Sequence, residues 1–248
     1  MTLNMAHRGF SGKYPENTML AFEKAVFEGN CDGFETDVHM SADGALIVIH
    51  DDTLDRTTTG SGRVDAMEYS QLQKLDAGVK YDAVFAGERI PLLADVLELV
   101  KKRDLMLNIE LKNMSVTSPG LETRVIELVR SMDMVEQVQL SSFNHISMVQ
   151  CARIAPEIYT ALLYMQPMYE AWIYALHCGA KALNPYFLLA QYEPQLAAYC
   201  ADLGLDINVW TVDEPEEIAE MCKLVKRGSI ISNYPDRVHA ALRGSKKA

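Results

Sequence analysis

The sequence predicts an α/β protein built as one (β/α)8, or TIM, barrel over residues 1–248, with a small insertion after the second strand. Three observations lead to this prediction. The chain has 248 residues, a length at which such barrels form one domain. Hydrophobic residues make up 49% of it, which is enough for one large core. Eight short apolar runs alternate with helical patterns, and this alternation indicates parallel strands joined by helices.

The first three elements are a strand, a helix and a strand. Leu3–Ala6 is a short apolar run that reads as the first strand. A turn-like stretch follows, in which Asn17 or Thr18 is suited to cap the helix after it. The helix is expected to end near Gly29, and the second strand to begin at Gly33. This order is that of one βαβ unit.

The stretch after the second strand departs from the alternation. The apolar run Leu46–Ile49 precedes residues 53–89, which are rich in Thr, Gly and Asp and contain one short helical pattern at Tyr69–Leu75. Such a stretch fits no strand–helix repeat, so we predict an insertion over about 45–90 on one face of the barrel. Ile90-Pro91 closes it before the next helix.

Helices and strands alternate regularly in the rest of the chain. The eight barrel strands are expected to begin at Leu3, Gly33, Leu105, Val138, Ile158, Lys181, Asp206 and Ser229. The helices after the insertion are expected over 92–102, 121–132, 146–154, 169–178, 191–203, 214–224 and 236–242. A doubly wound open sheet is the alternative, but the first strand lacks the glycine-rich turn typical of that fold.

Charge and cysteine content limit the class of function. The net charge is −11 and the pI about 5.0, which argues against a nucleic-acid-binding protein because such proteins need a basic surface. The five cysteines are odd in number and lack CxxC spacing, so we expect reduced thiols in a cytoplasmic protein. The sequence has no signal-peptide pattern and no apolar run that could span a bilayer, so no stable membrane association is expected. A homo-oligomer is compatible with the sequence.

Three carboxylates lie on or after predicted barrel strands. Glu35 and Asp37 are two residues apart on the second strand and therefore point to the same side, and Glu110 lies on the third strand. The carboxyl ends of barrel strands meet at one face, where active sites lie. Oxygen ligands suit a hard divalent cation, so we predict one Mg²⁺ or Ca²⁺ on these residues. For any one of them alone, an exposed charge is the commoner alternative.

Two histidines are predicted beside these carboxylates. His7 ends the first strand, and His50 follows the apolar run Leu46–Ile49. One would take a proton from the attacking group, and the other would give a proton to the leaving oxygen. A histidine that only packs and forms hydrogen bonds is the usual alternative for a single residue, but two at strand ends favour catalysis. His39 lies in the same stretch and is assigned no role.

Two cations and one aromatic residue complete the predicted site. Arg8 and Lys112 are expected to bind phosphate oxygens, Arg8 as a bidentate fork and Lys112 as a point charge, or only to pair with the carboxylates. Trp210, on the seventh strand, is expected to form an apolar wall against the alcohol portion of the substrate, with barrel filling as the alternative. Together these residues predict a metal-dependent hydrolase of anionic substrates.

The sequence resembles the glycerophosphodiester phosphodiesterase family in a series of short motifs. The matching segments are Ala6-His7-Arg8-Gly9, Pro15-Glu16-Asn17-Thr18, Glu35-x-Asp37-Val38, Asp43-Gly44, His50-Asp51, Leu54-Asp55-Arg56-Thr57-Thr58, Ile109-Glu110-Leu111-Lys112, Val209-Trp210-Thr211-Val212 and Pro235-Asp236. They occur in the family's order and extend over nearly the whole chain. HRG, ExD, HD and ELK together are far rarer than any one of them alone.

The resemblance implies a barrel enzyme that hydrolyses a glycerophosphodiester to an alcohol and sn-glycerol 3-phosphate. It implies the same metal ligands, acid–base pair and phosphate-binding cations as above. It adds Glu16 and Asn17 as residues that orient the end of the first strand.

Two segments depart from the family's pattern. The last strand commonly ends in Thr-Asp, where this chain has Ser232-Asn233, and Leu92-Leu93 stands where Thr-Leu is usual. Neither change is expected to touch a proposed ligand or histidine, so both bear on the choice of substrate rather than on the chemistry.

Two other functions are kept as alternatives. A phosphodiesterase of the lysophospholipase D type would need an apolar surface near the mouth, and the sequence offers only Tyr81–Phe85 for it. A non-catalytic barrel that binds a phosphorylated metabolite or a partner protein would be expected to have lost a histidine or a ligand. This chain keeps all of them.

Overall fold

A computed structural model describes residues 2–114, 118–193 and 195–244, and its strands form a closed barrel. The strands are β1 (Thr2–His7), β2 (Gly33–Met40), β3 (Leu46–Val48), β4 (Met106–Leu111), β5 (Val138–Ser142), β6 (Tyr159–Tyr164), β7 (Ala182–Pro185), β8 (Asp206–Val209) and β9 (Gly228–Ser232). All except β3 pair in parallel, and β1 closes the ring by pairing with both β2 and β9. The predicted TIM barrel is confirmed.

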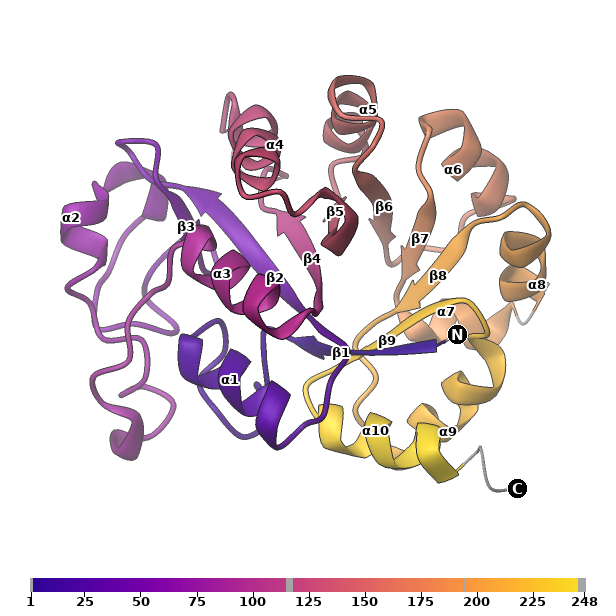
Figure 1. Ribbon diagram of the computed structural model, residues 1–248, viewed down its shortest axis with the longest axis horizontal. Helices are drawn as coiled ribbons and strands as arrows, with labels where there is room; N and C mark the ends of the chain where they lie inside the picture. The colour runs from indigo at the N-terminus through magenta and orange to yellow at the C-terminus, as the bar shows by residue number, and fades with distance from the viewer. Residues whose placement is uncertain (1, 115–117, 194, 245–248) are drawn as a thin grey trace.

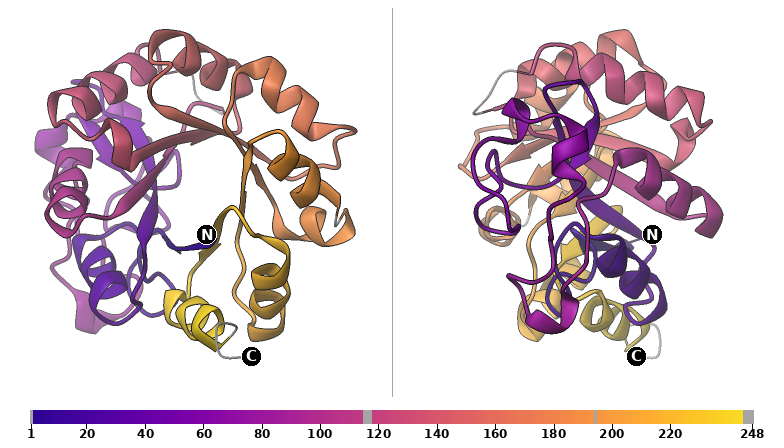
Figure 2. Two further views of the ribbon diagram at one scale, coloured as in Figure 1. Left: turned by 45° about the vertical axis from the view of Figure 1, so that its right-hand side comes forward. Right: turned by 90° about the vertical axis from the view of Figure 1, so that its left-hand side faces the viewer.

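Helices surround the barrel, as Figures 1 and 2 show. They are α1 (Met19–Phe27), α2 (Tyr69–Leu72), α3 (Leu93–Arg103), α4 (Leu121–Ser131), α5 (His145–Ile154), α6 (Ala171–Cys178), α7 (Phe187–Tyr192), α8 (Gln195–Asp202), α9 (Pro215–Leu224) and α10 (Pro235–Gly244). The helix predicted over 191–203 is wrong as one element, because α7 and α8 divide it, and residue 194 lies outside the described residues. Within the described residues, no helix has the length and apolarity to cross a membrane.

The start of α1 shows how local sequence positions the first part of the site. The hydroxyl of Thr18 accepts a hydrogen bond from the Ala21 N–H at 3.2 Å, so Thr18 is the N-cap of this helix. Asn17, the other predicted cap, is therefore free for another role. Its backbone is left-handed, with φ 56°, and its N–H donates to the carbonyl of Arg8 at 3.0 Å. This ties the end of β1 to the start of α1.

The insertion after the second strand is a small substructure beside β2, at the left of Figure 1. It begins with β3, which pairs antiparallel with β2 and lies outside the barrel ring. It also contains α2 and two 3-10 turns, η1 (Val64–Ala66) and η2 (Ala83–Phe85). A second hydrophobic cluster holds it together, made of Ile47, Ile49, Leu54, Val64, Leu72, Ala77 and Ile90. Because β3 is anchored to β2, the residues that follow it are held beside the barrel mouth.

A hydrogen-bonded layer of neutral polar side chains lies inside the barrel, whereas branched apolar residues usually fill such interiors. Gln139 donates to Asn108 Oδ1 at 3.3 Å, and Ser229 donates to Asn208 Oδ1 at 2.8 Å. Asn208 in turn donates to Asn184 Oδ1 at 2.8 Å. These side chains come from five different strands, so the network ties the strands together beneath the mouth.

Candidate active site

Three carboxylates converge at the carboxyl ends of β2 and β4. One ligand oxygen from each of Glu35, Asp37 and Glu110 lies within 4.8 Å of the others, and all three residues are buried. The strand register explains the convergence, because Asp37 on β2 stands directly opposite Glu110 on β4. The structure thus brings together the three side chains for which the sequence predicted a shared metal.

The three carboxyl groups differ in their tendency to ionise. Burial, reinforced by Asp37, raises the pKa of Glu35 well above its ordinary value. Burial also raises the pKa of Glu110 to about 7, although Lys112 opposes this. Burial acts on Asp37 in the same direction, but Arg8 and Lys112 hold the pKa of that carboxyl well below its usual range. Full ionisation of the cluster therefore requires additional positive charge.

The donor set fits a hard divalent cation. Asp37 Oδ1 is buried and has no hydrogen-bond partner, although a buried oxygen of this kind normally has one. It lies among carboxylate oxygens, which are the ligands that Mg²⁺ and Ca²⁺ prefer. A cation bound to these three residues would give Asp37 Oδ1 a closer partner than the Lys112 ammonium, 3.5 Å away, and would supply the missing positive charge.

Both predicted cations pair with the carboxylates. Arg8 Nε lies 3.1 Å from Asp37 Oδ2, and Arg8 also pairs with Glu16 at 3.0 Å. Lys112 Nζ lies 2.7 Å from Glu110 and 3.5 Å from Asp37 Oδ1. The pairing expected as the alternative to phosphate binding is therefore present. This pairing also holds both positive charges beside the cluster of three carboxylates.

Asn17 orients the central carboxylate. Its Nδ2 donates to Asp37 Oδ2 at 2.8 Å, and its Oδ1 accepts from the hydroxyl of Thr36 at 2.9 Å. Because Thr36 can donate only to the amide oxygen, the orientation of the Asn17 side chain is determined. Because Asn17 binds Oδ2 of Asp37, the other oxygen, Oδ1, is the one that points toward the cluster.

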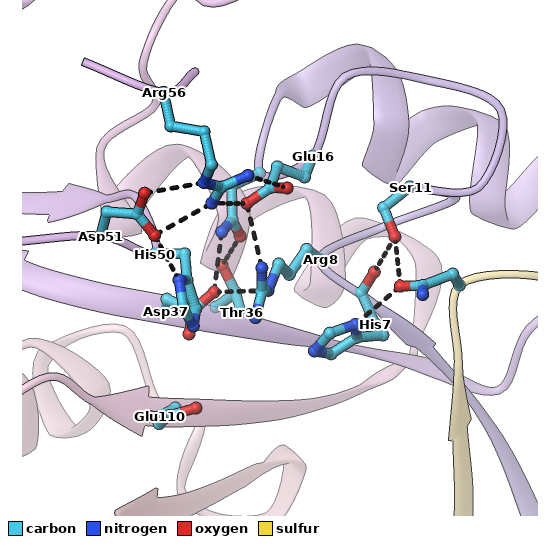
Figure 3. A network of polar contacts seen from close by, with 12 residues as sticks. His7, Arg8, Ser11, Glu16, Thr36, Asp37, His50, Asp51, Arg56 and Glu110 are labelled. Atoms are coloured by element: carbon cyan, nitrogen blue, oxygen red, sulfur yellow. Dashed lines mark hydrogen bonds and ion pairs between the residues drawn. The ribbon is translucent and has the colours of Figure 1, made fainter. Parts of the chain in front are cut away.

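A chain of ion pairs connects the central carboxylate with His50 (Figure 3). Glu16 accepts from Arg8 and also takes two hydrogen bonds from Arg56, each of 2.8 Å. Arg56 binds Asp51 with its other edge, at 2.7 and 3.0 Å. Asp51 Oδ1 lies 2.6 Å from His50 Nδ1. The imidazole of His50 is thereby held by one nitrogen, and its Nε2 is left for chemistry.

His7 is held by a different set of partners, in the right half of Figure 3. Its Nδ1 lies 2.7 Å from Oδ1 of Asn233, which also accepts from the hydroxyl of Ser11 at 2.7 Å. Asn233 follows β9 and donates its own Nδ2 to Asp213 at 2.6 Å. The expectation that the Ser232-Asn233 departure touches no proposed histidine is therefore wrong. The chain folds back on itself, and this residue becomes the direct partner of His7.

Burial affects both histidines. It lowers the pKa of His7 to about 4, and the charge of Arg8 acts in the same direction. It also lowers the pKa of His50, although Asp37 and Asp51 oppose this. At neutral pH both imidazoles therefore favour the neutral form, in which one nitrogen is an acceptor and the other a donor.

Six of the predicted residues line one cavity of about 230 Å³ at the barrel mouth, but Asp37 and Lys112 are not part of its lining. Its polar lining consists of His7, Arg8, Glu35, His50, Asn108 and Glu110. Its apolar lining consists of Phe143, Leu163, Met165, Trp210 and Ile231. Both histidines thus face the same space as two of the carboxylates, and Trp210 stands in the wall where the sequence placed it.

Several residues of the site escaped the sequence reasoning. Asn233 and Asp213, which position His7, each follow the end of a barrel strand, so their position was a usable signal. Phe143 also follows a strand, β5, but a lone aromatic residue there gives no chemical signal. His39, which was assigned no role, is buried and lies 3.1 Å from the carbonyl of His50, so it supports the backbone there.

The predicted apolar surface at Tyr81–Phe85 lies on the insertion. Tyr81 is 48% exposed and packs edge-on against Phe85, whose ring contacts Tyr14 in the same way. None of the three lines the mouth cavity. Met165, which does line it, is 51% exposed and is the apolar residue at the entrance that the sequence did not suggest.

Comparisons with known proteins show the family to which the chain belongs. Residues 7–237 match the model of the glycerophosphoryl diester phosphodiesterase family. A glycerophosphodiester phosphodiesterase of Caldanaerobacter subterraneus subsp. tengcongensis is 41% identical over 235 residues, which are 95% of each chain. A putative glycerophosphoryl diester phosphodiesterase from Silicibacter pomeroyi superposes with a TM-score of 0.88 at 27% identity, over 99% of this chain and 94% of the other. A phosphodiesterase from Oleispira antarctica, solved with the product sn-glycerol-3-phosphate, has a TM-score of 0.84 at 26% identity over 96% of each chain.

Proposed function

Because the chain belongs to the glycerophosphoryl diester phosphodiesterase family and is an enzyme of that activity, we propose a metal-dependent reaction with His7 and His50 as general acid and base. The products are an alcohol and sn-glycerol 3-phosphate. The observation that carries the proposal is that two separately tethered histidines share one cavity with converging carboxylates. A barrel that only binds phosphate has no need for two oriented imidazoles.

Glu35, Asp37 and Glu110 would hold the cation, either Mg²⁺ or Ca²⁺. When bound, it would neutralise the carboxylates and supply Lewis-acid polarisation of a phosphoryl oxygen. Arg8 lines the cavity and is fixed by Asp37 and Glu16, so its guanidinium presents a preorganised positive charge to the phosphate. Lys112 forms ion pairs with Glu110 and Asp37 and adds a second positive charge to this side of the site.

The two histidines would move the protons of the reaction. One imidazole takes a proton from the attacking hydroxyl as its oxygen bonds to phosphorus. The other must be an imidazolium, protonated on both ring nitrogens, when the second phosphorus–oxygen bond breaks, and it then gives its Nε2 proton to the alcohol oxygen. Each role needs one free ring nitrogen, and in each histidine Nδ1 is the tethered nitrogen. Nε2 is therefore the nitrogen that acts in both.

We propose that the barrel and its insertion work as one domain over residues 1–248. The carboxylates belong to barrel strands, whereas His50 lies two residues after β3 and is held by Asp51, which Arg56 binds within the insertion. Neither part contains the complete site. The five cysteines are buried and free, which supports a reducing compartment such as the cytoplasm.

A second candidate substrate is a monoacyl glycerophosphodiester. The loops and helix starts after β5 and β6 expose Ile146 (81%), Met165 (51%) and Tyr169 (91%), on the apolar side of the mouth. An acyl chain or a lipid surface would find apolar contacts there. This candidate uses the same site and the same chemistry.

The test is to incubate the purified protein with glycerophosphocholine and glycerophosphoethanolamine and to follow glycerol 3-phosphate with a coupled dehydrogenase. The assay is run with Mg²⁺ or Ca²⁺ and then with EDTA. We expect product release that EDTA abolishes and added metal restores. Release that persists after exhaustive chelation would contradict the metal dependence. A monoacyl substrate leaves an acylated glycerol phosphate, so its hydrolysis is followed instead as choline release. Choline released from lysophosphatidylcholine alone would favour the second candidate.

A further inference from the structure

The mouth cavity has two chemically different halves. The polar half carries two of the carboxylates, both histidines and Arg8, which lie on or directly after β1, β2 and β4 or in the insertion. The opposite half is formed by Phe143, Leu163, Met165, Trp210 and Ile231, which lie on or directly after β5, β6, β8 and β9. Among these five, only Trp210 has a hydrogen-bonding side chain, and its Nε1 already donates to the carbonyl of Asn184 at 2.7 Å. This half therefore offers a ligand no free side-chain hydrogen bond.

The substrate also has two different arms on its phosphate. The glycerol arm carries two hydroxyl groups, which lose free energy when they leave water without new hydrogen bonds. Only the polar half supplies such partners, including Asn108, whose one side-chain hydrogen bond among the described residues uses its Oδ1. The glycerol arm is thus directed to the polar half, and the alcohol portion faces the apolar half.

Two of the five apolar residues, Phe143 and Trp210, carry aromatic rings. The rings of Phe143 and Trp210 are nearly perpendicular, at 86°, with their centroids 5.5 Å apart. The ring of Tyr186 also packs against the indole of Trp210, with the ring centroids 5.8 Å apart and an angle of 61° between the ring planes. Its N–H bond and these two neighbours hold Trp210 in one orientation. A rigid aromatic wall of this kind attracts cations through the negative faces of its rings.

Hydrogen bonding separates the candidate alcohols. A primary ammonium group has three donors and a polyol has several hydroxyls, and each would lose water in this half of the cavity without replacement. A quaternary ammonium group has no hydrogen-bond donor, so it loses no hydrogen bond to water when it enters this half. Its methyl groups contact the apolar side chains, and its charge interacts with the aromatic faces. The net charge of −11 favours the zwitterionic choline and ethanolamine esters alike over an ester that is a net anion.

We propose that the wall formed by Phe143 and Trp210 binds the alcohol portion of the substrate and selects an alcohol that carries a quaternary ammonium group, as choline does. The proposal rests on the phosphodiesterase function proposed above and names the substrate class for that site.

The first experiment uses the wild-type protein with metal. It compares kcat/KM for glycerophosphocholine, glycerophosphoethanolamine and the 3,3-dimethylbutyl ester of glycerophosphate, in which carbon replaces the quaternary nitrogen. We expect the choline ester to exceed the ethanolamine ester by about tenfold, and the neutral isostere to be several-fold poorer than the choline ester. Equal values for choline and ethanolamine would overturn the proposal. A neutral isostere as good as choline would overturn the cationic part of it.

The second experiment uses Phe143→Leu, which keeps an apolar side chain and removes a ring. The ratio of kcat/KM for choline over ethanolamine is expected to fall toward one. Tyr192→Leu is the matched control, because Tyr192 is 81% exposed and does not line the cavity, and its ratio is expected to stay unchanged. An unchanged ratio in a folded Phe143→Leu protein would overturn the role of the ring. Hydrolysis of no ester with any metal would instead contradict the phosphodiesterase proposal itself.

Discussion

The imidazole of His7 and the carboxamide of Asn233 share a hydrogen bond of 2.7 Å between Nδ1 and Oδ1. Asn233 cannot turn its nitrogen toward His7, because Nδ2 donates to Asp213 at 2.6 Å. Its oxygen accepts, so Nδ1 of His7 carries the hydrogen. The remaining nitrogen, Nε2, lies 3.7 Å from Glu35. A residue 226 positions away thus determines the tautomer of His7.

This bond predicts the effect of removing the acceptor. Asn233→Leu should lower kcat/KM by about 10- to 100-fold, because the imidazole loses its orientation and its tautomer is no longer determined. Asn233→Asp keeps an acceptor oxygen at the same place and should recover part of the loss. Steady-state kinetics on both variants, with circular dichroism to confirm folding, checks the prediction. Full activity in Asn233→Leu would show that His7 needs no such partner.

The partner of His50 predicts a change in its titration. Burial lowers the pKa of His50, and the carboxylate of Asp51 opposes that effect because it stabilises the imidazolium. Asp51→Asn should therefore lower the pKa of His50 further, and NMR titration of the ring protons measures it. Asp52→Asn, which changes a neighbouring carboxylate that no hydrogen bond joins to His50, is the control. A higher pKa in Asp51→Asn would contradict the assignment.

The proposed acid and base predict large losses of activity. His7→Ala and His50→Ala should each lower kcat by at least about 100-fold, because each removes one proton transfer. His177→Ala, at an exposed position on α6, should retain full activity. Thermal unfolding and circular dichroism test whether the variants stay folded. An active, folded His50→Ala protein would remove that residue from the mechanism.

The carboxylate cluster predicts stabilisation by metal. A divalent cation at about 100 times its Kd should add about 2.7 kcal/mol to the free energy of unfolding. Asp37→Asn should abolish the metal-induced rise in Tm, because it removes a ligand oxygen from the centre of the cluster. The readout is the difference between Mg²⁺ and EDTA for each protein, so a change in the stability of the variant itself does not interfere. Asp202→Asn, at an exposed position on α8, should respond as the wild type does.

The raised pKa of Glu110 predicts that the free energy of unfolding depends on pH when EDTA has removed any metal. Its pKa is raised to about 7 in the folded protein, from 4.5 in the unfolded chain, so the folded state binds the proton more tightly. The stability that this contributes is fully present below about pH 4.5 and is lost as pH rises through about 7. The free energy of unfolding of the wild type relative to Glu110→Gln should therefore fall by about 3 kcal/mol over this range. Urea unfolding at several pH values measures it.

The sign of that change is the test. A relative stability that rises with pH would mean that Glu110 is ionised in the folded protein without metal. Glu98→Gln, at an exposed position on α3, should show no such trend relative to the wild type.

The barrel and the main chemical groups could be read from local pattern. Each barrel strand begins within one residue of its predicted start, because a buried parallel strand is a short apolar run that its own residues define. The convergence of Glu35 and Asp37 follows from alternation along one strand. The place of Glu110 follows from the rule that the carboxyl ends of barrel strands share one face. One predicted helix failed, over 191–203, where the sequence Glu193-Pro194 lies between α7 and α8 and a proline inside a helical pattern ends it.

The sequence by itself determined the fold class, the carboxylate cluster and the identity of the two histidines, since each depends on residues a few positions apart or on a rule that holds for every barrel. Only the tertiary structure decided how those histidines are held. His7 meets Asn233 because β1 pairs with β9 at the closure of the barrel, and Arg56 reaches Glu16 because the insertion packs beside the barrel mouth. Such partners are chosen by contact in space across long separations in the chain, and a linear pattern of apolar and polar residues carries no record of them.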